Sequence, residues 1–263
     1  VINGSPKSEY PVIPEFNTAA AFSVPAKELR DMIKRTIFAA SSDETRYVLN
    51  GVFWAASGGN LEFVATDGRR LALVKRAVVA KDKEFRAIIT TKILGELSRL
   101  LGSEECADKD VQVAVTENQV AFQTAETTML SRLVEGSFPN YEQVVPSKKD
   151  ISLVFDTKAL MTITKQAALC GVDRGGSVKF ALRKGGLHVS ASSQTLSFED
   201  ELAVDYKGAE FAIAFNPQYV LEGLKAMGTD KVRLSLTTPV NPALFEPEGG
   251  PEGYKYVVMP MRA

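Results

Sequence analysis

An internal repeat is the feature that most limits how this chain folds. Four segments of the first half resemble four segments of the second half, in the same order and at similar offsets. The matched pairs are 24–29 with 155–160, 61–65 with 187–191, 85–89 with 211–215, and 111–115 with 232–236. Any two halves of mixed helix and strand can be aligned loosely, and this alternative stays open, but the sequence favours two similar units in tandem.

Each unit combines helical and strand patterns. The stretches with helical spacing of apolar residues are 25–40, 91–102, 157–170 and 216–227. Segments between them alternate as antiparallel strands do. Asn216 and Pro217 are typical of a helix start, and Gly102 and Gly228 are expected to end the helices before them. We predict an α+β fold, a tandem repeat in which each unit packs two helices on antiparallel sheet.

A chain of 263 residues is long enough for two domains of about 100 to 150 residues each. The first sixteen residues are rich in proline and polar groups and begin without methionine, so we interpret them as an N-terminal linker in a piece of a longer chain. The predicted boundaries are 1–16 for this linker, 17–147 for the first unit and 148–263 for the second.

The distribution of charge is more informative than its sum. The net charge of −1 and the pI near 6.1 argue against a protein that grips nucleic acid by overall attraction. The four helical stretches nevertheless hold nine basic residues against four acidic ones, and the rest of the chain is acidic. The helices therefore offer a weakly positive surface to a polyanion, although solvated helix faces are an equally good explanation of the charge pattern alone.

The sequence offers no convincing catalytic or metal-binding set. Two cysteines in unrelated contexts, Cys106 and Cys170, and a single histidine, His188, do not supply the ligands of a zinc or iron site. His188 lies in an alternating strand pattern, where a structural role is the common one. We expect no cofactor, no membrane span and a cytoplasmic protein.

Three local strings resemble the bacterial DNA sliding clamp, the beta subunit of DNA polymerase III. They are RYVLNG at 46–51 followed by ATDGRRLA at 65–72, then EGSFPNY at 135–141 followed by VVP at 144–146, and YVVMPMR at 256–262. The similarity runs from about residue 16 to the end and matches the second and third of the three domains in that family. It implies a middle domain at 17–147, a C-terminal domain at 148–263, and a remnant of a missing first domain at 1–16.

This resemblance implies a scaffold and not an enzyme. Family members join head to tail as a homodimeric ring around duplex DNA, with no sequence preference, and they tether polymerases to it. The implied partners are the polymerase catalytic subunit, the clamp loader and repair polymerases, whereas this shorter chain is expected to be a monomer. The implied DNA-facing residues are Lys27, Arg30, Lys34, Arg46, Tyr47, Lys92, Lys158 and Lys165. A peptide-binding module that does not act on DNA is the alternative function.

The family's partners dock through a short peptide motif in a cleft between the second and third domains. Carried over by position, this cleft consists of Leu49, Thr66, Gly68, Arg69, Arg70, Leu71, Pro139, Gln143, Val144, Asn216, Tyr219, Val240, Val257, Val258, Met259, Pro260, Met261 and Arg262. The sequence departs from the family at Arg69, Gln143 and Ala263, where histidine, arginine and leucine are common, and Val48 replaces a tyrosine near the DNA. These departures predict a different peptide preference and a weaker DNA contact.

Overall fold

The structure is a computed structural model that describes residues 4–6, 21–78, 82–106, 108–171, 176–250 and 253–261. The first unit contains β1 (Ala21–Pro25), α1 (Ala26–Thr36), the 3-10 turns η3 (Ile37–Ala39) and η4 (Glu44–Leu49), β2 (Gly51–Ser57), β3 (Asn60–Thr66), β4 (Arg70–Arg76), β5 (Phe85–Thr90), α2 (Thr91–Leu100), β6 (Asp110–Val115), β7 (Gln119–Gln123) and β8 (Thr128–Arg132). The second contains β9 (Ile151–Asp156), α3 (Thr157–Ala168), η5 (Leu169–Gly171), β10 (Val178–Arg183), β11 (Gly186–Ser192), β12 (Ser197–Ala203), β13 (Phe211–Phe215), α4 (Pro217–Met227), β14 (Lys231–Leu236), β15 (Ala243–Glu248) and β16 (Tyr254–Val258).

The order of helices and strands confirms the tandem repeat. In both units a strand and a helix are followed by four strands, a second helix and three strands. The pairing also repeats, because β1-β6-β7-β8 corresponds to β9-β14-β15-β16, and β5-β2-β3-β4 corresponds to β13-β10-β11-β12. All of these neighbours are antiparallel, as the alternating sequence pattern predicts.

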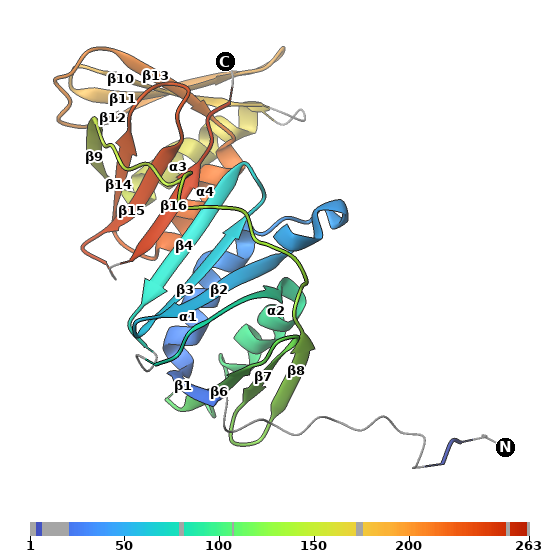
Figure 1. Cartoon of the computed structure of the whole chain (residues 1–263). Coiled ribbons are helices and arrows are strands. Elements are labelled where there is room, and N and C mark those ends of the chain that lie inside the picture. Colours follow the sequence, from blue (N-terminus) through green and yellow to red (C-terminus); the bar gives the residue numbers. More distant parts are fainter. Residues whose placement is uncertain are drawn as a thin grey trace.

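The two units are joined through one eight-stranded sheet, β5-β2-β3-β4-β16-β15-β14-β9. The join is the antiparallel pair β4·β16, in which Leu71 lies opposite Val257. All four helices contact strands of this sheet, and α1 also contacts α2 and α4 (Figure 1). The sequence patterns did not predict a continuous sheet, because pairing between strands of different units is not a local property of the chain.

Strand alternation gives the eight-stranded sheet two apolar faces. On the helix side, Ala72 and Val74 of β4 join Tyr254, Tyr256 and Val258 of β16 in the main core. On the opposite side, Leu71, Leu73 and Val257 form a smaller cluster with Val64 and Leu244. An ordinary half-exposed sheet would carry polar residues here, so this second face needs a cover.

The cover is the connector between the units, residues 133–150. Figure 1 shows it crossing the sheet near β4 and β16 before it enters β9. Phe138 stacks on Phe53 of β2 with ring centroids 5.1 Å apart, and Tyr141 packs against the same ring and donates a hydrogen bond to Glu62. Lys149 pairs with Glu246 of β15 at 2.5 Å, so the connector is fixed to both units.

The helix ends confirm the predicted signals. Asn216 caps α4 by accepting a hydrogen bond from the Gln218 amide at 2.9 Å, and Gly228 ends it with φ of 65°. Gly102 directly follows Leu101, the capping residue of α2, so it lies just beyond the helix end as predicted, but its φ is not positive as that of Gly228 is. Gly102 instead leaves room for the guanidinium of Arg30, which a Cβ atom would meet at 2.4 Å.

Residues 1–16, predicted to be an N-terminal linker, lie outside the described residues except for 4–6. Arg262 of the predicted cleft lies outside them as well. Among the helices that the structure describes, none has the length and apolar character needed to cross a membrane. Within the same ranges, no three His, Cys, Asp or Glu side chains gather as a metal site would require.

Candidate functional site

The candidate site lies at the β4·β16 join, where both units and the connector meet. Its first wall is the turn before β4. Gly68 lies in this turn and has a φ of 85°, a conformation that favours glycine. The Thr66 hydroxyl donates to the Arg70 carbonyl at 2.6 Å and accepts from the Gly68 amide at 3.0 Å. Asp67 accepts from the amides of Arg69 and Arg70 at 2.9 and 3.1 Å. The turn is therefore rigid and keeps the cleft edge in place.

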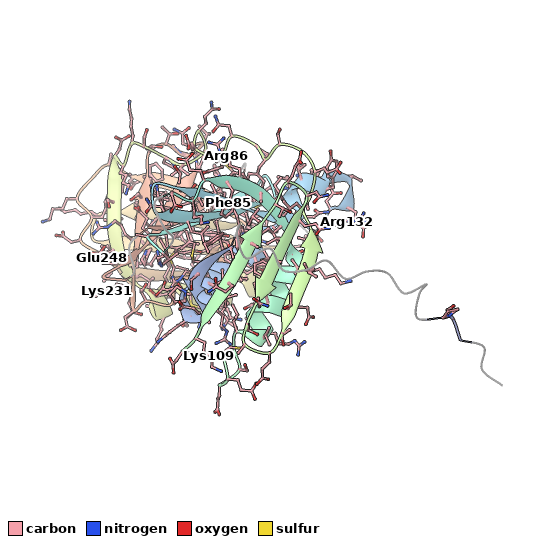
Figure 2. The ribbon with its side chains drawn as sticks, turned by 60° about the horizontal axis from the view of Figure 1, so that its bottom comes forward. Phe85, Arg86, Lys109, Arg132, Lys231 and Glu248 are labelled. Carbon is pink, nitrogen blue, oxygen red and sulfur yellow. The ribbon has the colours of Figure 1, made fainter. Side chains whose placement is uncertain are left out.

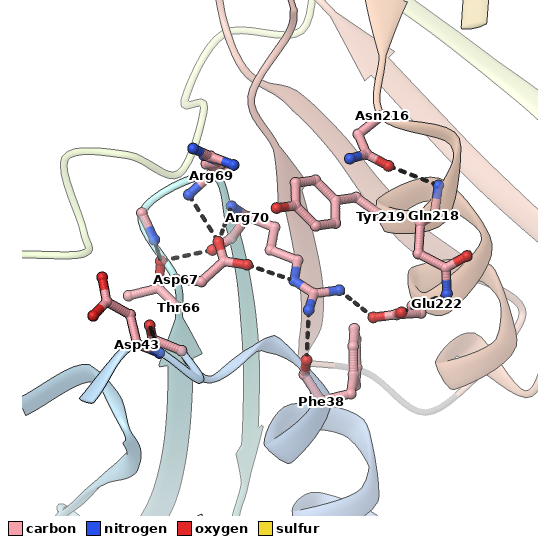
Figure 3. Close-up of polar contacts among 12 residues, drawn as sticks. Phe38, Asp43, Thr66, Asp67, Arg69, Arg70, Asn216, Gln218, Tyr219 and Glu222 are labelled. Carbon is pink, nitrogen blue, oxygen red and sulfur yellow. Dashed lines mark hydrogen bonds and ion pairs between the residues drawn. The ribbon is translucent and has the colours of Figure 1, made fainter. Parts of the chain in front are cut away.

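Arg70 links the two units through its guanidinium (Figure 3). It donates to Asp67 at 3.0 Å and to the Phe38 carbonyl at 2.8 Å within the first unit, and to Glu222 of α4 in the second. The same group lies 4.6 Å from the centre of the Tyr219 ring. Burial lowers the pKa of Arg70, but the bond to Glu222 and the nearby negative charges together raise it by more, so this arginine stays charged.

A first hollow of about 160 Å³ opens beside this turn. It is predominantly apolar, with walls from the first unit, the connector and β16, and Val144 and Met259 are partly exposed at its mouth. Its lining residues are Leu49, Thr66, Gly68, Arg70, Leu71, Pro139, Asn140, Tyr141, Val144, Val257 and Met259. Burial and the bond to Glu62 raise the pKa of Tyr141, so its hydroxyl remains a neutral donor.

A second hollow of about 610 Å³ lies on the other side of the final segment. Met259 faces the first hollow, whereas Pro260 and Met261 face the second, so residues 259–261 separate the two. Two backbone bonds fix this segment, from the Met259 amide to the Arg69 carbonyl at 2.9 Å and from the Met261 amide to the Ala214 carbonyl at 2.8 Å. The lining residues are Lys179, Ala212, Ile213, Ala214, Pro239, Val240, Pro260 and Met261.

Most predicted cleft residues come together, and one requires correction. Val258 is fully buried in the main core on the helix side, because alternation along β16 turns its side chain away from that of Val257. Arg69 and Gln143 are exposed near the first hollow but do not line it. Asn216 caps α4, and Tyr219 packs on Arg70, so both support the site from behind.

Several lining residues were not anticipated. Asn140 and Tyr141 adjoin the predicted Pro139, and their place in the connector was an available signal. In the second hollow the unanticipated residues come from β10, β13 and the β14–β15 turn, and they are Lys179, Ala212, Ile213, Ala214 and Pro239. These short strand motifs carry no local sign of a binding surface, and only sheet pairing brings them next to Met261.

The basic side chains of the helices differ in exposure, which the charge count alone did not predict. The side chains of Lys27, Lys34, Lys92, Lys158 and Lys165 are exposed. Arg30 is half-buried and donates to the Ser98 carbonyl of α2 at 3.2 Å. Arg35 is buried and donates to the Met227 carbonyl at 2.7 Å, at the end of α4 where a cation is favourable. Arg35 thus holds the two units together and is not part of an exposed basic face.

Arg46 and Tyr47, also predicted to face DNA, lie in η4 and close to the cleft. Arg46 pairs with Asp43 at 3.1 Å and donates to the Asp67 carbonyl at 2.9 Å, behind the turn that carries Gly68. Tyr47 is 59% exposed. A hydrogen bond from the Thr45 hydroxyl and one from the Thr45 amide lower the pKa of Asp43, so the pair with Arg46 is ionised.

The sequence of this chain matches known proteins over nearly its whole length. Residues 23–140 match the model of the DNA polymerase III beta subunit, central domain, and residues 142–262 match that of its C-terminal domain. A beta sliding clamp of Pseudomonas putida is 34% identical over 98% of this chain, and one of Bacillus subtilis is 30% identical over 99%. The chain spans 70% and 69% of the length of these two relatives.

Solved structures give the same result. The sliding clamp of Pseudomonas aeruginosa crystallised with a ligand has a TM-score of 0.91 and 33% identity, over 98% of this chain and 70% of that one. The beta subunit of Thermotoga maritima has a TM-score of 0.90 and 28% identity over the same shares. The chain therefore belongs to the family of DNA polymerase III beta subunits, the non-catalytic DNA sliding clamps.

Proposed function

We propose that the two hollows at the β4·β16 join form one docking cleft for extended peptides of replication and repair proteins. The proposed partners are the polymerase catalytic subunit, the clamp loader and repair polymerases. The observation that carries the proposal is an apolar hollow built jointly from both units and their connector, with the partly exposed Val144 and Met259 at its mouth. Pockets of this kind, lined by aliphatic and methionine side chains, suit peptides with apolar anchor residues.

The expected affinity follows from the size of the hollows. Each buried aliphatic or aromatic anchor contributes about 1.5 to 3 kcal/mol, and ordering a flexible peptide offsets part of that gain. We expect dissociation constants of about micromolar order. Such binding is strong enough to hold a partner on a clamp and weak enough to let partners exchange.

A single substitution at the mouth of the first hollow tests the cleft. The probe is a nine-residue peptide selected on this chain from a random library, called here the selected peptide. Val144→Asp places a charge against the apolar anchor, and we expect calorimetry to show at least a tenfold weaker affinity. The control is Leu196→Asp, which changes an exposed leucine in the β11–β12 turn and leaves binding intact. Equal affinities of the two variants would refute the cleft.

We also propose that the exposed lysines of α1, α2 and α3 face duplex DNA and contact its phosphates without sequence preference. Five of the predicted residues support this, because the side chains of Lys27, Lys34, Lys92, Lys158 and Lys165 are exposed. Weak phosphate contacts suit a clamp, since they orient the protein while allowing it to slide. Arg30 contributes indirectly by holding α2 against α1.

Salt dependence tests the DNA-facing surface. Replacing Lys27, Lys34, Lys92 and Lys165 with glutamine is expected to weaken binding to a fluorescent duplex at low salt. The slope of log K against log salt should fall by about 0.9 for each phosphate that the variant no longer neutralises. The control carries the same charge change at exposed lysines outside the helices, Lys148, Lys184, Lys207 and Lys231. Identical slopes for both variants would favour a peptide-binding module that does not act on DNA.

Edge strands supply the proposed contacts of a ring. By the repeat, β12 corresponds to β4 and β8 corresponds to β16, and β12 and β8 are both edge strands. We propose that these edges join neighbouring domains when a full-length subunit forms its homodimeric ring, with units 17–147 and 148–263 as the middle and C-terminal domains. Figure 2 shows Arg132, at the end of β8, on the opposite side of the view from Lys231 and Glu248 of the second unit.

The 263-residue chain alone is predicted to be a monomer. At the β4·β16 join, β4 contributes Leu71 and Leu73 to the smaller apolar cluster, but the corresponding positions of β12 are Ser197 and Glu199. Pairing β12 with β8 of another copy would therefore desolvate a carboxylate and gain little apolar burial. Light scattering at micromolar concentration should give a mass near 28.6 kDa. A mass of twice that value would contradict the prediction.

A further inference from the structure

The second hollow has a floor of small side chains. Lys179 of β10 lies opposite Ala214 of β13, and Ala181 lies opposite Ala212, so these four side chains share one face of the sheet. Ile213 and Phe180 between them turn to the other face and are buried in the core. The methyl groups of Ala212 and Ala214 leave space above the sheet, and this space is the hollow of about 610 Å³.

Two segments from other parts of the fold form its walls. The turn between β14 and β15 contributes Pro239 and Val240, and Val240 is 80% exposed. The final segment contributes Pro260 and Met261, which the bond to the Ala214 carbonyl holds against the edge of β13. The two hollows therefore lie on either side of the same segment, residues 259–261.

Lys179 is the polar feature of this apolar space. Among the described residues that line the hollow, it alone carries a charge. Its side chain is exposed, and no hydrogen bond or ion pair joins the ammonium group to another residue in the part of the chain that the structure describes. Lys184, an exposed lysine in the turn after β10, does not line this hollow.

We propose that Lys179 determines peptide specificity by binding a carboxylate of the docked peptide, next to an apolar residue that packs on Val240 and Met261. The carboxylate is either the C-terminal group of the peptide or an Asp or Glu side chain. A single ammonium group among apolar residues matches a single negative charge, and its apolar surroundings strengthen the attraction. The inference rests on the proposed peptide cleft. It adds that the bound peptide carries a carboxylate next to one of its apolar anchors.

Parallel selections test this proposal directly. A nine-residue random library with free C-termini is selected on the wild-type chain, on Lys179→Glu and on Lys184→Glu. We expect the wild-type and Lys184→Glu selections to enrich the same acidic or C-terminal carboxylate position. The Lys179→Glu selection should lose that preference and favour lysine or arginine there. If all three selections enrich peptides with the same charge at every position, the proposed role of Lys179 is wrong.

Affinity measurements then separate the two sources of the carboxylate. The selected peptide is compared with its C-terminal amide and with the peptide in which its acidic side chains become amides. Loss of the correct carboxylate should weaken binding about three- to fivefold on wild type and not on Lys179→Ala, as expected for an exposed ion pair. Equal losses on both proteins would overturn the inference but leave the cleft intact. If no peptide from any selection binds, the cleft itself fails, and the inference fails with it.

Discussion

Removing residues 259–263 abolishes binding of the selected peptide, with an expected loss of at least about 100-fold. Met259 lines the first hollow, and Pro260 and Met261 line the second, so the truncation takes a wall from both. Each of two apolar anchors would then lose part of the surface on which it packs, and each contributes about 1.5 to 3 kcal/mol when fully packed. Calorimetric titration of the truncated chain measures the loss.

The truncation should leave the fold largely intact. It removes two backbone hydrogen bonds to Arg69 and Ala214, each with a net contribution of about 1 kcal/mol, and two methionines that are both partly exposed. We expect the free energy of unfolding to fall by about 2 kcal/mol, measured by denaturant titration. A folded truncated chain with unchanged peptide affinity would remove residues 259–261 from the cleft.

Arg70→Ala is expected to produce the largest loss of stability among single substitutions at the join. The variant leaves the carboxylates of Asp67 and Glu222 without their cation, and it removes the packing of the guanidinium on the Tyr219 ring. Breaking a largely buried ion pair from one side costs about 3 to 5 kcal/mol. Because Glu222 is 30% exposed, we expect the lower end, about 3 kcal/mol, from chemical denaturation.

Two controls separate the role of this link from a general effect of removing an arginine. Arg99→Ala removes an exposed pair with Glu96 and should change the unfolding free energy by less than about 0.5 kcal/mol. Combining Arg70→Met with Glu222→Gln should recover part of the stability, because Glu222, one of the two carboxylates paired with Arg70, is then no longer left charged and unpaired. If Arg70→Ala costs no more than Arg99→Ala, the link does not hold the units together.

The sequence predicted those parts of the fold that depend on local patterns. Apolar periodicity located the four α-helices of the described residues, and the capping roles of Asn216 and Gly228 follow from the amide side chain of the one and the backbone freedom of the other. Gly102 also lies just beyond the end of its helix, but the sequence did not predict that Arg30, a residue of a different helix far away along the chain, takes the space beside it. Long-range packing of this kind leaves no local signal.

For the cleft, too, the sequence predicted what local motifs determine and missed what depends on long-range packing. Matching motifs grouped Leu71, Val144 and Met259 from the sequence alone, but position did not tell which side of β16 Val258 faces. Strand alternation carried that information, since neighbouring residues of a strand point to opposite faces. Lys179 could not be predicted, because only sheet pairing places β10 beside the final segment.

Arg35 illustrates how a charge count differs from a surface. It was counted among the basic residues of α1, yet it is 8% exposed and binds the end of α4. Its position three residues after the buried Met32 was an available warning, because this spacing places both on neighbouring parts of one helix face. Helical position therefore predicts exposure better than residue type does.

Residue-resolved chemical-shift changes during titration with the selected peptide test the central claim most directly. A cleft shared by both units predicts that the largest shifts occur together at Gly68 and Leu71, at Val144 of the connector, and at Met259 and Met261. Strands β7 and β8, at the far end of the first unit, should show none. Saturable shifts confined to a single unit, or centred away from the β4·β16 join, would contradict the account.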